Sequence, residues 1–184
     1  MTTLRPRIAL APDGPGLALG RAHEASGPAR RVFAALAAGS LQNGAAAGET
    51  LWIVGGRETG GREAAGLDPE GLAPFMDPGR LLAACAPHGL DALWAAEEAL
   101  RSGAVAAVVV EPRVPPALTP VRRLHLAAEA GAERGPARPL CLILTPEGGT
   151  ASAVETRWRA EPLPGWATDP RPGGGPARWR FTLL

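Results

Sequence analysis

The chain has 184 residues, a length suited to one domain, and 46% of them are hydrophobic. Its 24 glycines and 20 prolines predict many loops. The 19 basic residues are all arginine and nearly balance 18 acidic residues, which argues against a nonspecific polyanion binder but allows a local basic patch. Because there is no lysine, Schiff-base chemistry and the lysine of a phosphate-binding loop are excluded.

The cysteines and the apolar runs predict the compartment. Cys85 and Cys141 each lie in an apolar run, and no charged segment precedes an apolar one at the N-terminus as it would in a secretory signal. We therefore expect reduced thiols and a cytoplasmic protein. The longest apolar run, over residues 104–110, suits a buried strand and is too short to span a membrane, so no membrane partner is expected.

Chemical motifs are sparse. The three histidines, His23, His88 and His125, lie far apart without metal-ligand spacing, so we expect structural or solvent-exposed roles and no metal site. The chain contains no GxSxG, CxxC or HExxH motif. We therefore assign no catalytic residue and expect neither an enzyme nor a cofactor.

The predicted elements alternate along the chain. Residues 1–20 are rich in Pro, Gly and Arg without a sustained period, and they predict a leader or loop that is not itself a packed element. One α/β domain is expected over residues 21–184. Helices are expected over residues 28–38, 91–102 and 119–130, a helical turn over 69–75, and strands over 50–56, 80–85, 104–110 and 139–145. The apolar strands between helices predict a mostly parallel sheet flanked by helices, with the strand over residues 104–110 at its centre.

Local signals suggest where the helices begin and end. Gly39 and Gly103 are expected to follow the first two helices. Asp91 is a candidate N-cap of the second, and Thr119 of the third, with Pro120 as its first helical residue.

The tryptophans divide into two groups. Trp52 and Trp94, in strand and helix contexts, are expected in the core. Residues 145–184 predict a C-terminal extension, with two antiparallel strands over residues 152–162 and 177–184. There, Trp158 and Trp179 each stand between two arginines. That pattern fits an edge strand with one packed face, a protein partner surface, or base stacking with phosphate contacts.

We expect the partner surface in this C-terminal extension, because Trp and Arg are enriched in interface hot spots. Trp166 lies in a predicted loop rich in Pro and Gly, where a large aromatic side chain is not expected unless a partner covers it. The candidate partner-binding residues are Trp158, Arg159, Trp166, Arg178, Trp179 and Arg180.

Four segments together resemble the core of RecA-type ATPases in order and spacing. They are GRAHEASGPARRVFAALAAGS, TLWIVGG, DALWAAEEALRSGAVAAVVVEP and PPALTPVRRLHLAAEAG. More narrowly, ALWAAEEALR, ETRWR and the closing WRFTLL resemble the ImuA family of bacterial SOS-mutagenesis accessory proteins. The resemblance runs from about residue 20 to 184 and implies a RecA-like α/β domain.

The nucleotide site that this resemblance implies is degenerate. The stretch corresponding to the phosphate loop has one glycine, Gly27, and carries Arg30 and Arg31 but neither lysine nor hydroxyl. These arginines fit either a residual phosphate site at a helix start or two solvated side chains. Glu111 stands at the magnesium-binding carboxylate position, whereas the water-activating glutamate is absent or displaced to Glu58. ATP hydrolysis is therefore not expected.

The resemblance implies a non-catalytic accessory protein of damage-induced, error-prone translesion synthesis. The implied partners are a catalytically inactive Y-family-like polymerase homologue of the ImuB type, an error-prone replicative-type polymerase and RecA, with DNA contacted indirectly. Two alternatives remain open. One is a nucleotide-binding switch or weak ATPase using Glu111 with Arg30 or Arg31, and the other is a single-stranded DNA-binding protein using the Arg-Trp-Arg strands.

Overall fold

The computed structural model describes residues 6–10, 14–44, 48–56, 66–136, 138–146, 151, 153–163 and 178–184. The strands are β1 (Arg7–Ile8), β2 (Leu17–Ala18), β3 (Ala22–Ser26), β4 (Thr50–Gly55), β5 (Leu81–Ala86), β6 (Ala107–Glu111), β7 (Leu140–Leu144), β8 (Arg157–Leu163) and β9 (Arg178–Leu183). The helices are α1 (Arg30–Gln42), α3 (Pro69–Leu72), the 3-10 helix η1 (Pro78–Arg80), α4 (Gly89–Ser102) and α5 (Leu118–Arg134).

Seven strands form one sheet in the order β5-β4-β6-β7-β3-β8-β9. The five strands from β5 to β3 are mutually parallel, and β8 extends the parallel array beside β3. Only β9, which pairs with β8, runs antiparallel in the described sheet. The expected α/β class, with a mostly parallel sheet, flanking helices and a C-terminal antiparallel pair, is confirmed.

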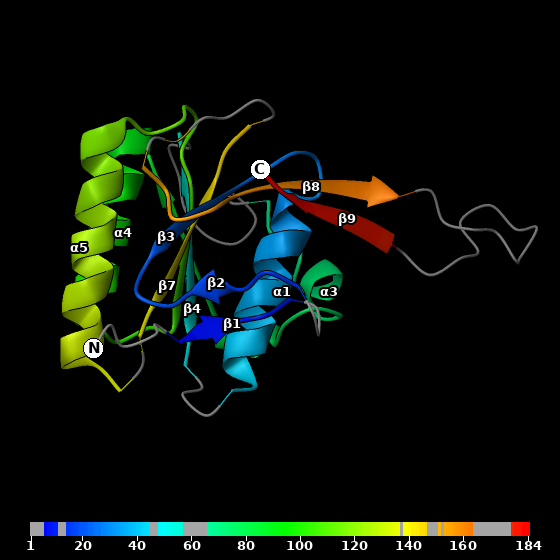
Figure 1. Ribbon diagram of the computed structural model, residues 1–184, viewed down its shortest axis with the longest axis horizontal. Helices are drawn as coiled ribbons and strands as arrows, with labels where there is room; N and C mark the ends of the chain where they lie inside the picture. Colours follow the sequence, from blue (N-terminus) through cyan, green and yellow to red (C-terminus); the bar gives the residue numbers. More distant parts are fainter. Residues whose placement is uncertain are drawn as a thin grey trace, which may run out of the picture.

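The helices cover opposite faces of the sheet (Figure 1). α1 and α3 pack on the face that holds Trp52, Val109 and Trp158. α4 and α5 pack together on the other face, over Val108 and Val110. Successive strand residues point to opposite faces, so one apolar strand serves both layers.

The strand predicted to be central occupies that position. Val108, Val109 and Val110 of β6 are all 0% exposed, and β6 lies between β4 and β7 in parallel register. Strands flanked by two parallel neighbours and covered on both faces are usually apolar throughout. The run of valines is explained by that position.

The N-terminal twenty residues differ from the expected leader. β1 and β2 form an antiparallel pair, and Leu17 of β2 is fully buried in the core on the α1 side. Ile8 and Leu10 pack against the same cluster. Strands of two residues are too short to show a hydrophobic period in the sequence, so no pattern could have predicted them.

The strand β3 is absent from the sequence expectations. Its sequence, AHEAS, places His23 and Glu24 at fully buried positions. Buried charged and polar groups need partners, and those partners lie far away in the chain. No local signal identifies such a strand.

Two helices continue past the ends expected for them at residues 38 and 130. α1 runs to Gln42 through Gly39, and α5 runs to Arg134 through Gly131. A Cβ on Gly131 would lie 1.9 Å from the backbone oxygen of Leu100 in α4, and one on Gly39 would lie 2.0 Å from that of Phe75. Both glycines serve close backbone approach, not helix termination.

The helix starts also differ from expectation. α4 begins at Gly89 after His88, so Asp91 lies in its first turn, and α5 begins at Leu118 after Ala117. Gly103 ends α4 in a left-handed conformation, as predicted. Thr119 is inside α5, not its N-cap, and Pro120 occupies the first turn, where no intrahelical N–H bond is lost.

One tryptophan assignment is correct and the other is wrong. Trp52 is 0% exposed, whereas Trp94 is 56% exposed. α4 turns Leu93 and Leu100 inward, and a neighbour one residue later points about 100° away from that direction. Trp94 therefore lies outside the core.

Among the described helices, none is long and apolar enough to cross a membrane.

Candidate functional site

The turn between β3 and α1 occupies the place where a phosphate loop would lie. Gly27 adopts φ +90°, and the backbone N–H of Ala29 donates to the carbonyl oxygen of Ala160 in β8 at 3.0 Å. The N–H of Arg30 donates to the carbonyl of Gly27 at 3.2 Å. A phosphate would need N–H groups pointing outward at a helix start. In this turn two of the N–H groups, those of Ala29 and Arg30, already donate to carbonyl oxygens of the protein.

The carboxylate of Glu111 is held by two donors. It ends β6 on the α1 side of the sheet, since residues 107, 109 and 111 alternate with Val108 and Val110. Its Oε1 accepts the indole N–H of Trp52 at 2.7 Å and pairs with Nε of Arg31 at 2.8 Å. Arg31 also donates to the carbonyl of Gly66 at 2.8 Å. The predicted carboxylate and one predicted arginine are thus brought together as an internal ion pair.

A hollow of about 250 Å³ adjoins this pair at the carboxyl ends of the parallel strands. Such crevices, where neighbouring strands connect to opposite faces, are the usual ligand positions of open α/β sheets. It is lined by Arg30, Val54, Gly55, Glu111, Pro112, Arg113, Leu144 and Pro146. Within the described residues, the buried Nε of Arg30 has no hydrogen-bond partner, although its NH1 donates to Gly27. Because Arg30 and Arg113 outnumber Glu111 among the lining residues, the hollow is cationic.

The other residues of the expected nucleotide site are not placed. Glu58, the displaced water-activating candidate, and Arg57 before it lie outside the described residues. Among the described residues, no group of three or more His, Cys, Asp or Glu side chains could hold a metal ion.

His23 links β3 to β2 and to the residue before β8, on the α1 side of the sheet. Its Nε2 lies 3.0 Å from the carbonyl oxygen of Ala18, and its Nδ1 lies 2.7 Å from Oγ1 of Thr156. That hydroxyl also accepts the indole N–H of Trp158 at 2.7 Å. The carbonyl requires a proton on Nε2, so the threonine hydroxyl donates to Nδ1. Burial lowers the pKa of His23 to about 4, which keeps the imidazole neutral.

The Glu24 side chain lies on the other face of β3, where it accepts hydrogen bonds from three segments of the chain. Its carboxylate is 0% exposed and accepts the Thr145 hydroxyl at 2.6 Å, the Ala151 N–H at 3.1 Å and Nε of Arg157 at 2.6 Å. These donors come from the end of β7, the following connection and the start of β8. The buried charge is satisfied, and it ties β8 to the sheet.

The aromatic rings of the C-terminal strands face the α1 side. Trp158 is 4% exposed, and its ring centroid lies 5.3 Å from that of Phe33. Trp179 packs edge-on against Phe75, with 5.2 Å between the ring centroids. A ring that is 4% exposed offers little surface to a partner, so we place Trp158 in the core and not on a partner surface. The packed-face interpretation of the Arg-Trp-Arg pattern thus accounts for Trp158.

The arginines of the same strands lie on the opposite, outer face. Arg178 and Arg180 are exposed, and Arg159 is partly exposed and pairs with Glu161 at 3.0 Å. The antiparallel register sets Arg180 directly beside Glu161. We call Arg159, Arg178 and Arg180 the outer arginine face. Trp166, the remaining predicted contact residue, lies outside the described residues.

The two cysteines are both free thiols. Cys141 is fully buried in β7, and burial raises the pKa of its thiol to about 12. A thiol with this pKa is not a nucleophile at neutral pH. Neither cysteine is part of the hollow beside Glu111.

The crystal structure of SulA from Pseudomonas aeruginosa is similar to this chain at 24% sequence identity and a TM-score of 0.49. The match covers 67% of this chain and 97% of the SulA chain. No protein-family model matches the sequence, and no curated protein matches it.

Proposed function

We propose that this chain is a non-catalytic accessory protein of damage-induced, error-prone translesion DNA synthesis, acting through protein–protein contacts. The translesion role is supported by the resemblance to the ImuA family in the segments quoted above. The partners proposed from that resemblance are an inactive Y-family-like polymerase homologue, an error-prone replicative-type polymerase and RecA.

The observation that carries the non-catalytic part is the state of Glu111. A carboxylate that coordinates Mg²⁺ through water must offer its oxygens to the site. Here Oε1 is bound by both Trp52 and Arg31, and the loop amide of Ala29 is bound by the Ala160 carbonyl. Oε1 of Glu111, the guanidinium of Arg31 and the amide of Ala29 are thus engaged within the protein, which supports binding rather than catalysis as the proposed activity.

We propose the outer arginine face as the partner surface. It lies on the side of β8 and β9 opposite the packed rings, and it carries three arginines beside one glutamate, Glu161. Exposed arginines can form bidentate contacts with carboxylates of a partner. On the opposite side of the same two strands, Trp158 and Phe181 pack on Phe33, which holds the strands in place.

The test is co-purification of the tagged full chain from DNA-damaged cells, with the captured proteins identified by mass spectrometry. We expect a polymerase-like protein with the wild type, and its loss in the Arg178→Ala, Arg180→Ala double variant. Arg122→Ala on α5 is the matched control, because it removes another exposed arginine at a different place on the surface. Retention by the double variant together with loss in Arg122→Ala would place the partner on α5. Absence of any polymerase-like protein from the wild-type sample would reject the translesion role.

A nucleotide-binding switch is the second candidate, favoured by the cationic hollow beside Glu111. Calorimetry with ATP and Mg²⁺, and a phosphate-release assay, separate the two functions. We expect neither saturable binding at millimolar ATP nor phosphate release. Saturable Mg²⁺-dependent binding that Glu111→Gln abolishes would support the switch instead.

A further inference from the structure

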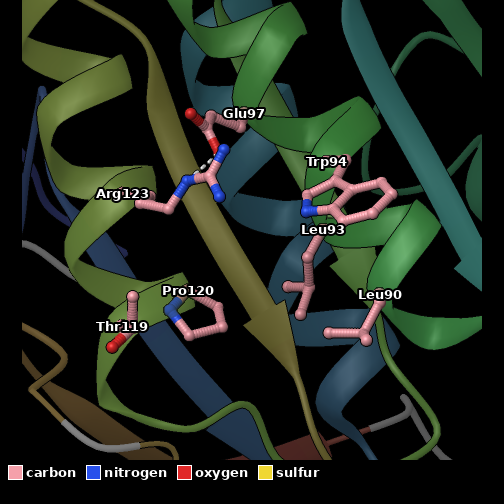
Figure 2. Close-up of a pocket in the computed structure, with 7 residues that line it drawn as sticks. All are labelled: Leu90, Leu93, Trp94, Glu97, Thr119, Pro120 and Arg123. Carbon is pink, nitrogen blue, oxygen red and sulfur yellow. Dashed lines mark ion pairs between the residues drawn. The ribbon is translucent and has the colours of Figure 1, made fainter.

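A groove runs between the beginnings of α4 and α5. It consists of two adjoining hollows of about 50 and 320 Å³ that share Leu90, Leu93 and Pro120. The connection from β6 to α5, residues 112–117, closes the larger hollow. Figure 2 shows the smaller one, with Leu93 of α4 opposite Pro120 of α5 and Glu97 paired with Arg123.

The groove holds apolar side chains that the core does not use. Leu90 is 59% exposed, Trp94 is 56% exposed and Val114 is 71% exposed, and all three line it. Leu93, at its floor, is 5% exposed and belongs to the core. Large apolar groups gathered at one hollow, rather than scattered singly, are typical of an interaction site.

The walls of the groove suit a bound helix. Leu90, Trp94 and Glu97 follow one another at intervals of four and three residues along one side of α4, and Pro120 and Arg123 form the opposite wall on α5. A groove between two helices accepts the apolar face of a third helix, whose anchors recur every three or four residues. The hollow extends over about two turns of α4.

The charge at the groove is positive. Arg113 lines the larger hollow and Arg123 the smaller one, where its side chain is 52% exposed. Glu97 is the one carboxylate among the lining residues, and its side chain is only 5% exposed. It is paired with Arg123 at 2.7 Å and with Arg101. An occupant that approaches from solvent therefore meets arginines, which favours acidic residues beside its apolar anchors.

We propose that this groove binds an amphipathic helix of a partner protein, with aliphatic or aromatic anchors flanked by carboxylates. The anchors contact Leu90, Trp94 and Pro120, and the carboxylates face Arg113 and Arg123. The inference does not depend on the function proposed above, since it uses neither the outer arginine face nor the resemblance.

The test is a selection from a phage-displayed library of random peptides of about 16 residues, long enough for a helix. The full chain is the target, and a Leu90→Ser, Trp94→Ser double variant is the counter-target. We expect enriched peptides with apolar residues at intervals of three and four and with acidic neighbours. Their affinity should fall at least about tenfold in the double variant and in Arg113→Ala.

The controls separate a lost site from lost folding. Leu126→Ser removes another apolar side chain, 64% exposed on α5 and not lining the groove, and it should leave binding unchanged. Thermal melting of each variant should match the wild type. Enrichment of basic peptides, equal binding to the double variant, or no enrichment over it would overturn the proposal.

A second copy of the chain is the competing occupant. Sedimentation measurements on the wild type and on Trp94→Ser decide this. A monomer in both samples fits a partner helix, whereas a wild-type dimer that Trp94→Ser dissociates would assign the groove to self-association and contradict the proposal.

Discussion

The guanidinium of Arg31 and the carboxylate of Glu111 meet at 2.8 Å across the space between α1 and the end of β6. The Glu111 side chain is 9% exposed and that of Arg31 35% exposed, so this is a partly buried pair reinforced by the indole of Trp52. The two residues that would serve a phosphate and its metal in a working site instead neutralise each other.

Breaking this pair from one side should destabilise the fold. Arg31→Met leaves a nearly buried carboxylate without its counter-charge, and we expect a loss of about 2 kcal/mol in the free energy of unfolding measured with urea. Glu111→Gln added to Arg31→Met should recover part of that loss. Costs that simply add would show that the pair has no coupling.

Val109 tests the central strand. It is 0% exposed between two parallel neighbours, and Val109→Asp places an unpaired charge there, at a cost of several kcal/mol, comparable to the total stability. We expect no cooperative thermal transition. Leu126→Asp, at a 64% exposed position, should fold normally. A Val109→Asp variant that stays soluble and melts cooperatively would contradict the sheet order.

Stability should fall with pH through His23. Burial lowers the pKa of His23 from 6.5 to about 4 in the folded chain. Between these values the unfolded chain binds the extra proton, so stability present above pH 6.5 is lost as pH falls toward 4. The loss from this residue is on the order of 3 kcal/mol. Urea unfolding of His23→Gln across this range should show a flatter profile, and parallel profiles would exclude the effect.

Gly131→Ala should destabilise α5 although alanine is the better helix former. Propensity alone predicts a gain of about 1 kcal/mol. The added Cβ would lie 1.9 Å from the Leu100 carbonyl oxygen, so α4 and α5 must separate, and we expect a net loss of about 2 kcal/mol or more. Ala130→Gly measures the ordinary propensity term at the neighbouring position. A higher melting temperature for Gly131→Ala would show that the helices are not tightly packed there.

Trp158 tests whether the C-terminal strands belong to the core. Trp158→Ala removes a ring packed on Phe33 and an indole bond to Thr156, and we expect a loss of about 3 kcal/mol or more. Arg180→Ala, on the outer side of the neighbouring strand, should change stability by less than about 0.5 kcal/mol. Similar small effects of both substitutions would contradict the packed position of Trp158.

The sequence by itself determined the α/β class, the central place of residues 108–110 and the loss of the phosphate-binding lysine. These features are carried by local patterns or by residue identity. Short apolar runs rich in valine between turn residues are typical of strands covered on both faces, and a missing side chain cannot be restored by folding.

The tertiary structure decided the features whose physical cause lies far away in the chain. β3 is a strand because Thr156, Thr145 and Arg157 supply hydrogen bonds to its buried His23 and Glu24. Gly131 lies inside a helix because α4 approaches α5 too closely there for a side chain to fit. The ion pair of Arg31 with Glu111 depends on how α1 crosses the sheet. Such long-range contacts satisfy polar groups and set close approaches that no local period encodes.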